Sequence, residues 1–220
     1  RRTVATVLPF SSLSIGIGLA RYIALYSGKG QRTEPLLPAA VFISSISSFL
    51  VCLAMLPFYD SLSELLFNRK GKEIFFILIM FQLFGENLFI CLYAYYRGHQ
   101  KMRQANIWGG SIQGLLPIII VFIVVLMNNT VDIVILGIGS LFYLSLFSLV
   151  PKIISAIKIT SYVDLKNNVI KLMKYSIPRA PGGLAATLIL TFGVLISPYT
   201  GGVANAAYLA IGIWFIQIIQ

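Results

Sequence analysis

The chain has 220 residues, of which 58% are hydrophobic and only 11% are charged, and its formal net charge is +10 at pH 7. Soluble domains carry roughly 25% charged residues, so a soluble globular protein is excluded because too little polar surface is available to cover the apolar side chains. The composition predicts an integral membrane protein, and basic residues spread between apolar segments are typical of topology signals rather than of a nucleic-acid interface.

Seven apolar segments approach the length of about 20 residues that crosses a bilayer. They cover residues 3–26, 37–58, 74–96, 107–127, 131–151, 176–198 and 203–220. Strands of a membrane barrel would alternate between polar and apolar residues, whereas the run 118–125 is apolar throughout. We therefore expect an all-α fold, a polytopic bundle of transmembrane helices with about seven spans.

The distribution of basic residues predicts the orientation of these spans. Twelve of the 17 Lys and Arg residues fall on the side of the connections that follow the first, third and fifth spans. Cytoplasmic loops are enriched in Lys and Arg, so the connections near 27–34, 97–104 and 152–174 are predicted to be cytoplasmic. The first segment then runs from outside to inside, and we expect one further span before it. Because the chain begins and ends at apolar runs, we expect a fragment of a longer protein.

Glu86 is the clearest functional candidate, because ionisable side chains at membrane depth are costly and usually face a bundle interior or a water-filled cavity. It lies in the middle of 74–96, one helical turn after Gln82 and beside Asn87. Its carboxylate fits proton coupling, contact with a polar substrate, or a structural hydrogen bond to a neighbouring helix.

Two arginines near the predicted cytoplasmic ends of spans are further candidates. Arg21 lies five residues before the end of the first apolar segment, where it either snorkels to the interface or meets a phosphate from a cavity wall. Arg179 stands between Pro178 and Pro181, in a stretch that interrupts helical hydrogen bonding. It is either a topology charge or a bidentate ligand for an anionic headgroup or pyrophosphate.

Small residues within the apolar segments predict close contacts between helices. The pairs in question are Gly16/Gly18, Gly110/Gly114, Gly137/Gly139 and Gly182/Gly183.

No enzymatic activity is predicted. The sequence has no nucleophile–base pair, no phosphate-binding glycine-rich loop and no acidic cluster for metal-assisted transfer, so no catalytic residue is assigned and no cofactor is expected. His99 is the only histidine and lies in a basic loop, which gives no support for a metal site.

Four stretches of the chain are similar to parts of one transporter family. Residues 18–30 are similar to the end of its second helix and the short basic loop that follows, and residues 95–98 are similar to the exit from its fourth helix. Residues 174–182 are similar to the start of its seventh helix, and residues 201–208 are similar to the turn into its eighth helix. In this order and spacing they resemble the oligosaccharide flippases of O-antigen type, the polysaccharide-biosynthesis branch of the multidrug/oligosaccharidyl-lipid/polysaccharide exporter superfamily.

The resemblance implies helices two to eight of a transporter with twelve to fourteen helices, arranged as two lobes around a central cavity and working by alternating access. Residues 1–157 would form the first lobe without its first helix, residues 158–174 a cytoplasmic amphipathic linker, and residues 175–220 the start of the second lobe. The linker mixes apolar and basic residues at helical spacing, as in a helix that lies on an anionic leaflet.

The implied substrate is an undecaprenyl-pyrophosphate-linked oligosaccharide, a repeat unit of O-antigen or another surface polysaccharide. It would be flipped from the inner to the outer leaflet of the bacterial cytoplasmic membrane. Arg21 and Arg179 would meet the pyrophosphate and Gln82 and Glu86 the sugars, with Asn87 as a further cavity candidate. The implied partners, besides the bilayer, are a polysaccharide polymerase and other assembly proteins, and no nucleic acid.

Three other classes of protein are compatible with parts of the sequence. A multidrug or cation antiporter of the same superfamily would have a compact apolar cavity with carboxylates. A membrane-embedded glycan polymerase or ligase usually carries a large outer loop, and the outer loops here are short. A scaffolding membrane protein would not need Gln82, Glu86 and Arg179 at membrane depth.

Overall fold

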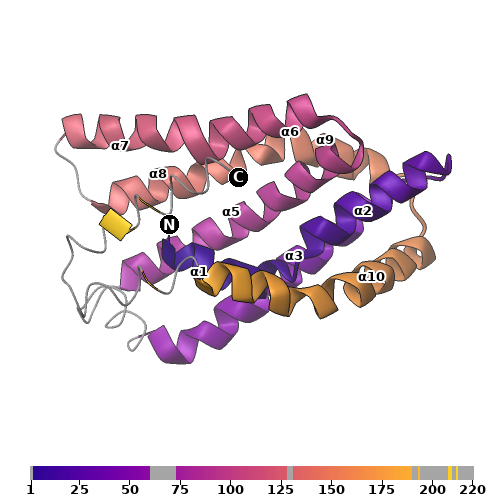
Figure 1. Ribbon diagram of the computed structural model, residues 1–220, viewed down its shortest axis with the longest axis horizontal. Helices are drawn as coiled ribbons and strands as arrows, with labels where there is room; N and C mark the ends of the chain where they lie inside the picture. The colour runs from indigo at the N-terminus through magenta and orange to yellow at the C-terminus, as the bar shows by residue number, and fades with distance from the viewer. Residues whose placement is uncertain are drawn as a thin grey trace.

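The computed structural model of the protein describes residues 2–59, 73–127 and 131–189, together with the single residues 193, 208, 209 and 212. All regular structure in these ranges is helical, which confirms the expected all-α fold (Figure 1). The elements are α1 (Arg2–Ser12), α2 (Ile15–Gly28), α3 (Leu36–Met55), η1 (Leu56–Phe58), α5 (Glu73–Gly98), α6 (Met102–Gly109), the π-helical η2 (Gly110–Leu115), α7 (Leu116–Leu126), α8 (Val131–Tyr143), α9 (Ser145–Ile157), α10 (Tyr162–Ser176) and η3 (Ile177–Arg179).

Four helical stretches of the described chain are long and apolar enough to cross a membrane. They are Leu36–Phe58, Phe76–Gly98, Met102–Leu126 and Ile133–Ile157. An α-helix satisfies its own backbone hydrogen bonds, which is why such runs can cross hydrocarbon. These stretches correspond to the second to fifth of the seven predicted spans, so the membrane-protein character of the chain is confirmed for them.

The first predicted span, 3–26, is not one continuous helix, which corrects the sequence-based expectation. α1 ends at Ser12 and α2 begins at Ile15, and the two residues between them, Leu13 and Ser14, have positive φ angles of 46° and 56°. This left-handed backbone is costly for residues other than glycine and ends the regular α-helix.

The last two predicted spans fall largely outside the described residues. The segment 176–198 is described continuously only to residue 189, and 203–220 only at Tyr208, Leu209 and Gly212. In the described part, α10 leads through η3 into helical residues 180–189, so residues 162–174 of the predicted linker and the described residues 176–189 of the sixth span form one bent helical segment.

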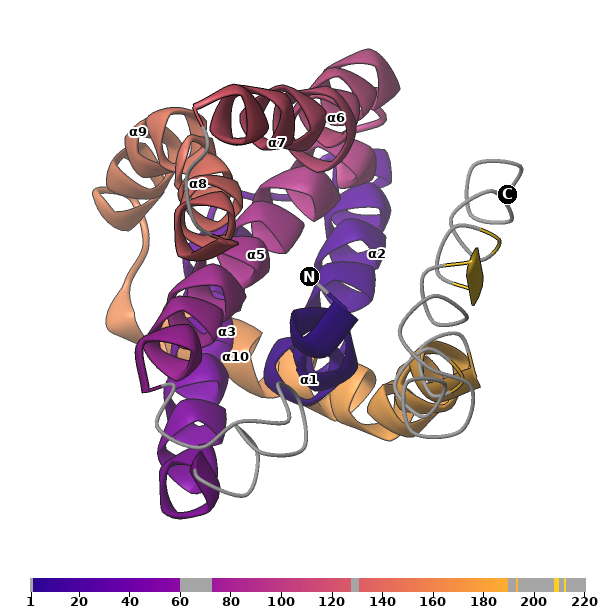
Figure 2. The ribbon, with the colours of Figure 1, turned by 90° about the vertical axis from the view of Figure 1, so that its left-hand side faces the viewer.

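α5 is the central helix of the bundle (Figures 1 and 2). Of an 18-residue apolar window within Phe76–Gly98, 61% is buried, compared with 17% of the corresponding window within Met102–Leu126. Leu83 belongs to an apolar cluster with residues of α1 and α3, Leu92 to one with residues of α2 and α3, and Phe89 to one with residues of η2 and α8. Polar side chains on α5 are therefore shielded from lipid by several neighbouring helices.

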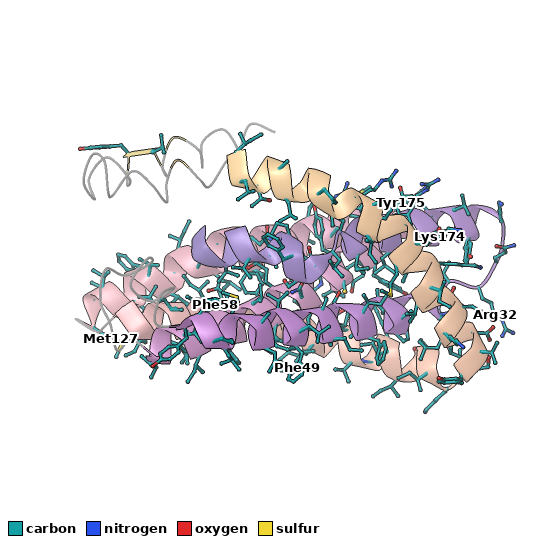
Figure 3. All side chains as sticks on the ribbon, turned by 90° about the horizontal axis from the view of Figure 1, so that it is seen from below. Arg32, Phe49, Phe58, Met127, Lys174 and Tyr175 are labelled. Atoms are coloured by element: carbon teal, nitrogen blue, oxygen red, sulfur yellow. The ribbon has the colours of Figure 1, made fainter. Side chains whose placement is uncertain are left out.

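The connections after α2, α5 and α9 lie at the same end of the bundle, the right-hand end in Figure 1. The exposed basic residues Lys29, Arg32, Lys101, Arg103 and Lys158 lie in or beside them. Figure 3 shows Arg32 at this end and Met127 at the other. The described basic connections thus lie at one end of the helix bundle.

Glycines set the closest helix crossings. A Cβ atom added at Gly16 would lie 2.7 Å from Cγ2 of Ile90, and one at Gly137 would lie 2.9 Å from Cγ2 of Ile120. By contrast, no atom of the described residues lies within 4 Å of such an atom at Gly110 or Gly114, so the contact predicted for this pair is not made within the described part of the chain. The spacing of two glycines indicates that they lie on the same face of a helix. It does not indicate that another helix packs against that face.

Gly85, which no sequence pattern singled out, marks the tightest crossing between α5 and α8. An added Cβ would lie 2.7 Å from Cε2 of Tyr143 and 2.9 Å from Cβ of Phe142. The Tyr143 hydroxyl also donates to the Phe81 carbonyl at 2.8 Å, and the rings of Tyr143 and Phe81 stack with centroids 4.4 Å apart. Tyr143 is thus held in place and cannot easily move away.

Replacing Gly85 by Ala is expected to lower the free energy of unfolding by about 1–3 kcal/mol, the usual effect of overpacking a filled interior. Gly114→Ala is the matched control, because its added methyl group meets open space. Thermal unfolding in detergent, followed by tryptophan fluorescence, compares the two variants. Equal melting temperatures would contradict the tight crossing of α5 and α8.

Candidate functional site

Arg21 and Arg179, far apart in the sequence, meet at one aromatic ring. The guanidinium carbon of Arg21 lies 4.4 Å from the ring centroid of Tyr175, and that of Arg179 lies 3.9 Å from the same centroid. Both distances fall within the range of cation–π attraction. Both arginine side chains are exposed, so the ring positions the guanidinium groups without covering them.

Three further side chains of α2 and α10 extend this arrangement. The Tyr22 ring packs edge-on against Tyr175, with centroids 5.7 Å apart, and against Tyr26, with centroids 6.0 Å apart. Nζ of Lys171 donates to the Tyr26 hydroxyl at 3.0 Å, and this hydrogen bond holds the pKa of Lys171 above its ordinary value. The six residues Arg21, Tyr22, Tyr26, Lys171, Tyr175 and Arg179 are termed the α2–α10 cluster below.

Gly18 allows α2 and α10 to approach closely enough to form the cluster. A Cβ atom at this position would collide with the Ser176 hydroxyl and would lie 3.4 Å from Cδ1 of Tyr175. One turn of α2 beyond Gly18 stands Arg21, which therefore faces the part of α10 that carries Tyr175. A larger residue at position 18 would separate the two arginines.

The α2–α10 cluster suits an anionic ligand with several oxygen atoms. It holds two guanidinium groups and one ammonium group and contains no carboxylate to neutralise them. Guanidinium groups bind phosphate bidentately, and Lys adds a point charge. The cluster therefore has the chemistry to bind one or two phosphate groups at the surface of the bundle.

The other three candidates lie inside the protein on α5. The exposed fractions of Gln82, Glu86 and Asn87 are 1%, 8% and 2%. Gln82 lies on the side of α5 that crosses α8, because its Cβ is 3.5 Å from the place that a Cβ of Gly139 would take. Neighbouring helices thus shield all three side chains from lipid.

Asn87 joins α5 to two other helices. Its Nδ2 donates to the hydroxyls of Ser11 in α1 and Ser48 in α3, both at 2.8 Å. Each hydroxyl in turn donates to a carbonyl of its own helix, that of Leu8 at 3.0 Å or of Ser44 at 2.7 Å. Both amide hydrogens are therefore used, whereas Oδ1 of Asn87 has no hydrogen-bond partner among the described residues.

The two groups of candidates do not form a single site. α2 packs on α5 with Gly16 against Ile90 and with Ile23 against Gly98, so Arg21 lies level with the last turns of α5. Glu86 lies nearly three turns earlier on α5, roughly 15 Å along its axis at 1.5 Å per residue. The arginines thus lie near the basic end of the bundle, and the polar side chains lie deeper inside it.

Sequence reasoning missed the aromatic and hydroxyl members of both groups. The tyrosines of the cluster were not among the candidates that the sequence indicated. The buried serines Ser11, Ser44, Ser47 and Ser48 were not considered at all, although two pairs of serines within the apolar segment 37–58 were a usable signal. Hydroxyls so placed in lipid need partners in neighbouring helices or in their own backbone.

Among the described residues, no group of three or more His, Cys, Asp or Glu side chains is placed to hold a metal ion. Comparison of the chain with profiles of known protein families, with curated proteins and with solved structures finds no significant match. The assignment of a function therefore depends on the chemistry of the α2–α10 cluster and of the buried side chains of α5.

Replacing Asn87 by Ala is expected to lower the free energy of unfolding by about 1–3 kcal/mol, because two hydrogen bonds between helices are lost and each contributes roughly 0.6–1.7 kcal/mol in a membrane protein. Asn106→Ala is the matched control, since Asn106 is exposed on α6. Thermal unfolding in detergent measures both. If the Asn87→Ala and Asn106→Ala variants have the same melting temperature, the Asn87 amide does not hold α1, α3 and α5 together.

Proposed function

We propose that the protein is a membrane transporter that flips an undecaprenyl-pyrophosphate-linked oligosaccharide from the inner to the outer leaflet by alternating access. The observation that supports it is the pair of exposed guanidinium groups, Arg21 and Arg179, on the ring of Tyr175. A pyrophosphate between a lipid tail and a sugar would offer oxygen atoms to both groups at once. The same charges repel a cationic substrate, which favours a flippase over a cation antiporter.

The proposal places the protein in the bacterial cytoplasmic membrane, with the connections near 27–34, 97–104 and 152–174 on the cytoplasmic side. Two observations support this orientation. The described connections after α2, α5 and α9 lie at one end of the bundle and carry exposed basic residues. The α2–α10 cluster lies toward that end, where a substrate assembled in the cytoplasm would first meet the transporter.

The buried polar residues of α5 extend the proposal to the sugar part of the substrate. Gln82 and Glu86 are held one turn apart, away from lipid. When the surrounding helices move apart, these side chains can form hydrogen bonds with sugar hydroxyls. Alternatively, the carboxylate of Glu86 can take up and release a proton. The experiments below treat the phosphate and the deeper polar group separately.

Replacing Arg21 or Arg179 by Ala in the full-length protein is expected to weaken transport about 10-fold or more, because a hydrogen bond to a charged group contributes about 1.5–3 kcal/mol. Arg→Lys at either position should be intermediate, since the charge stays and the planar fork is lost. Transport of labelled lipid-linked oligosaccharide into the outer leaflet of proteoliposomes measures the effect. Arg103→Ala, at an exposed arginine of α6, is the control.

Normal transport by both alanine variants would contradict a role for the cluster in substrate binding. Loss of transport in Arg103→Ala as well would indicate a general effect of positive charge. Export of small cations by the unaltered protein, without movement of the glycolipid, would favour the antiporter.

Replacing Glu86 by Gln is expected to impair transport while the amount of folded protein in the membrane stays normal. The amide keeps the shape of the side chain but cannot take up or release a proton. Glu34→Gln, at an exposed carboxylate in the connection after α2, is the matched control. Unchanged transport would remove Glu86 from the mechanism, and a reduced amount of folded protein would assign it a structural role.

A further inference from the structure

We propose that α10 binds the surface of an anionic phospholipid leaflet through an apolar, lysine-flanked face that the rest of the described structure leaves uncovered. This inference does not depend on the proposed transport function. It rests on how the residues of α10 divide among the faces of the helix, and on where the helix lies in the bundle.

One face of α10 is used by the protein itself. Leu172 and Ser176 are buried, and Leu165 and Val169 pack against the apolar core that α2, α3 and α5 share. These positions recur at intervals of four, three and four residues, which places them on one side of the helix. This inner face accounts for the docking of α10 onto the bundle.

A second apolar stripe runs along a different side of the same helix. Val163, Ile170, Met173 and Ile177 have exposed fractions of 64%, 53%, 36% and 44%. They recur at intervals of seven, three and four residues, so they also share a side. Only the inner stripe packs against the described part of the protein, so the exposed stripe needs another partner. The charges beside the exposed stripe indicate which partner this is.

Basic residues flank the exposed stripe. Lys166 lies on the same side as the stripe, four residues before Ile170, and Lys174 lies at its edge, and both are exposed. Asp164 is the only acidic residue of α10, and its carboxylate accepts a hydrogen bond from the Ser161 hydroxyl at the start of the helix. Apolar side chains bordered by lysines are typical of helices that lie at an anionic membrane surface, where the lysine stems cover apolar groups and the ammonium groups reach phosphates.

The position of α10 agrees with such a partner. Figures 2 and 3 show α10 crossing the bundle obliquely, unlike the spanning helices, before the chain turns near Tyr175. It begins beside the basic connection after α9. An oblique helix at this end lies near the depth at which headgroups meet acyl chains, so charge complementarity favours an anionic leaflet over a protein.

Lys171 provides an internal comparison. It lies on a third side of α10 and donates to Tyr26, so it belongs to the α2–α10 cluster and not to the exposed stripe. Lys166 and Lys174 should therefore select the lipid, whereas Lys171 should not. The lipid-binding face and the cluster can thus be altered independently.

The test uses the full-length protein in lipid nanodiscs. Ile170→Cys is labelled with a bimane fluorophore, and the protein without this substitution gives the background, since both native cysteines are buried. Quenching by brominated phosphatidylglycerol and by brominated phosphatidylcholine, each at the same fraction of the lipid, gives the relative affinity of the site for the two headgroups. Asn168→Cys, two residues away and therefore on a different side of the helix, is the control position.

We expect the probe at position 170 to be quenched by lipid and the probe at position 168 to be quenched far less. Phosphatidylglycerol should be preferred, and Lys166→Gln and Lys174→Gln should each reduce that preference about fivefold, the effect of roughly 1 kcal/mol for each Lys near a charged leaflet. Lys171→Gln should leave it unchanged. If Ile170→Cys does not fold, Met173→Cys serves in its place.

Three outcomes would overturn the proposal. A probe at 170 and at 173 that no lipid quenches would show that protein covers the stripe. Disulfide-linked pairs formed by the unlabelled Ile170→Cys protein on addition of an oxidant would then identify a second copy as the covering protein. Equal quenching by the two lipids would show apolar contact without selection for anionic headgroups. A preference that depends on Lys171 as strongly as on Lys166 would assign the lipid to the α2–α10 cluster.

Discussion

A polar group within hydrocarbon must find its hydrogen-bond partner inside the protein, and the arrangement of α1, α3 and α5 follows from this constraint. An unsatisfied backbone group in lipid costs several kcal/mol. The Ser47 hydroxyl of α3 donates to the Ser11 carbonyl at the end of α1, and Asn87 of α5 donates to the Ser11 hydroxyl. The break between α1 and α2 is thus tolerated because two neighbouring helices bring donors to it.

The same break determines how the α2–α10 cluster is built. Since α2 does not continue the axis of α1 through a regular helix, its direction is set by its own contacts with α5 and α10. Gly16 lets it approach Ile90 of α5, and Gly18 lets it approach Ser176 of α10. With both approaches made, Arg21 reaches the ring of Tyr175, where Arg179 already lies.

The parts of the fold that the sequence predicted are those governed by local composition. Four apolar runs became membrane-length helices, because length and hydropathy suffice to specify a spanning helix. The burial of Glu86 follows from the same reasoning, since a carboxylate facing acyl chains is too costly. The close approach of other helices to Gly16 and Gly18 was also predicted, because glycine has no side chain to keep them apart.

What the sequence did not predict depends on tertiary contacts. Leucine at a positive φ has no local signature, so nothing marked the break at Leu13 in advance. The contact of Arg21 with Tyr175 joins residues far apart in the chain, and no periodicity reports it. Gly110 and Gly114 show the converse, because their spacing is typical of helix contacts although no helix of the described part of the chain meets them.

An aromatic ring, rather than a carboxylate, holds the two arginines, and this choice has a chemical consequence. A carboxylate would bind a guanidinium group strongly and cancel its charge, leaving little for a ligand. A cation–π contact at an exposed site contributes only about 0.5–1 kcal/mol and leaves the charge uncancelled. Charge-assisted hydrogen bonds to a phosphate, at about 1.5–3 kcal/mol each, can therefore draw the arginines from Tyr175 at small cost. The ring keeps two like charges close together in the absence of a ligand and releases them to a doubly anionic one.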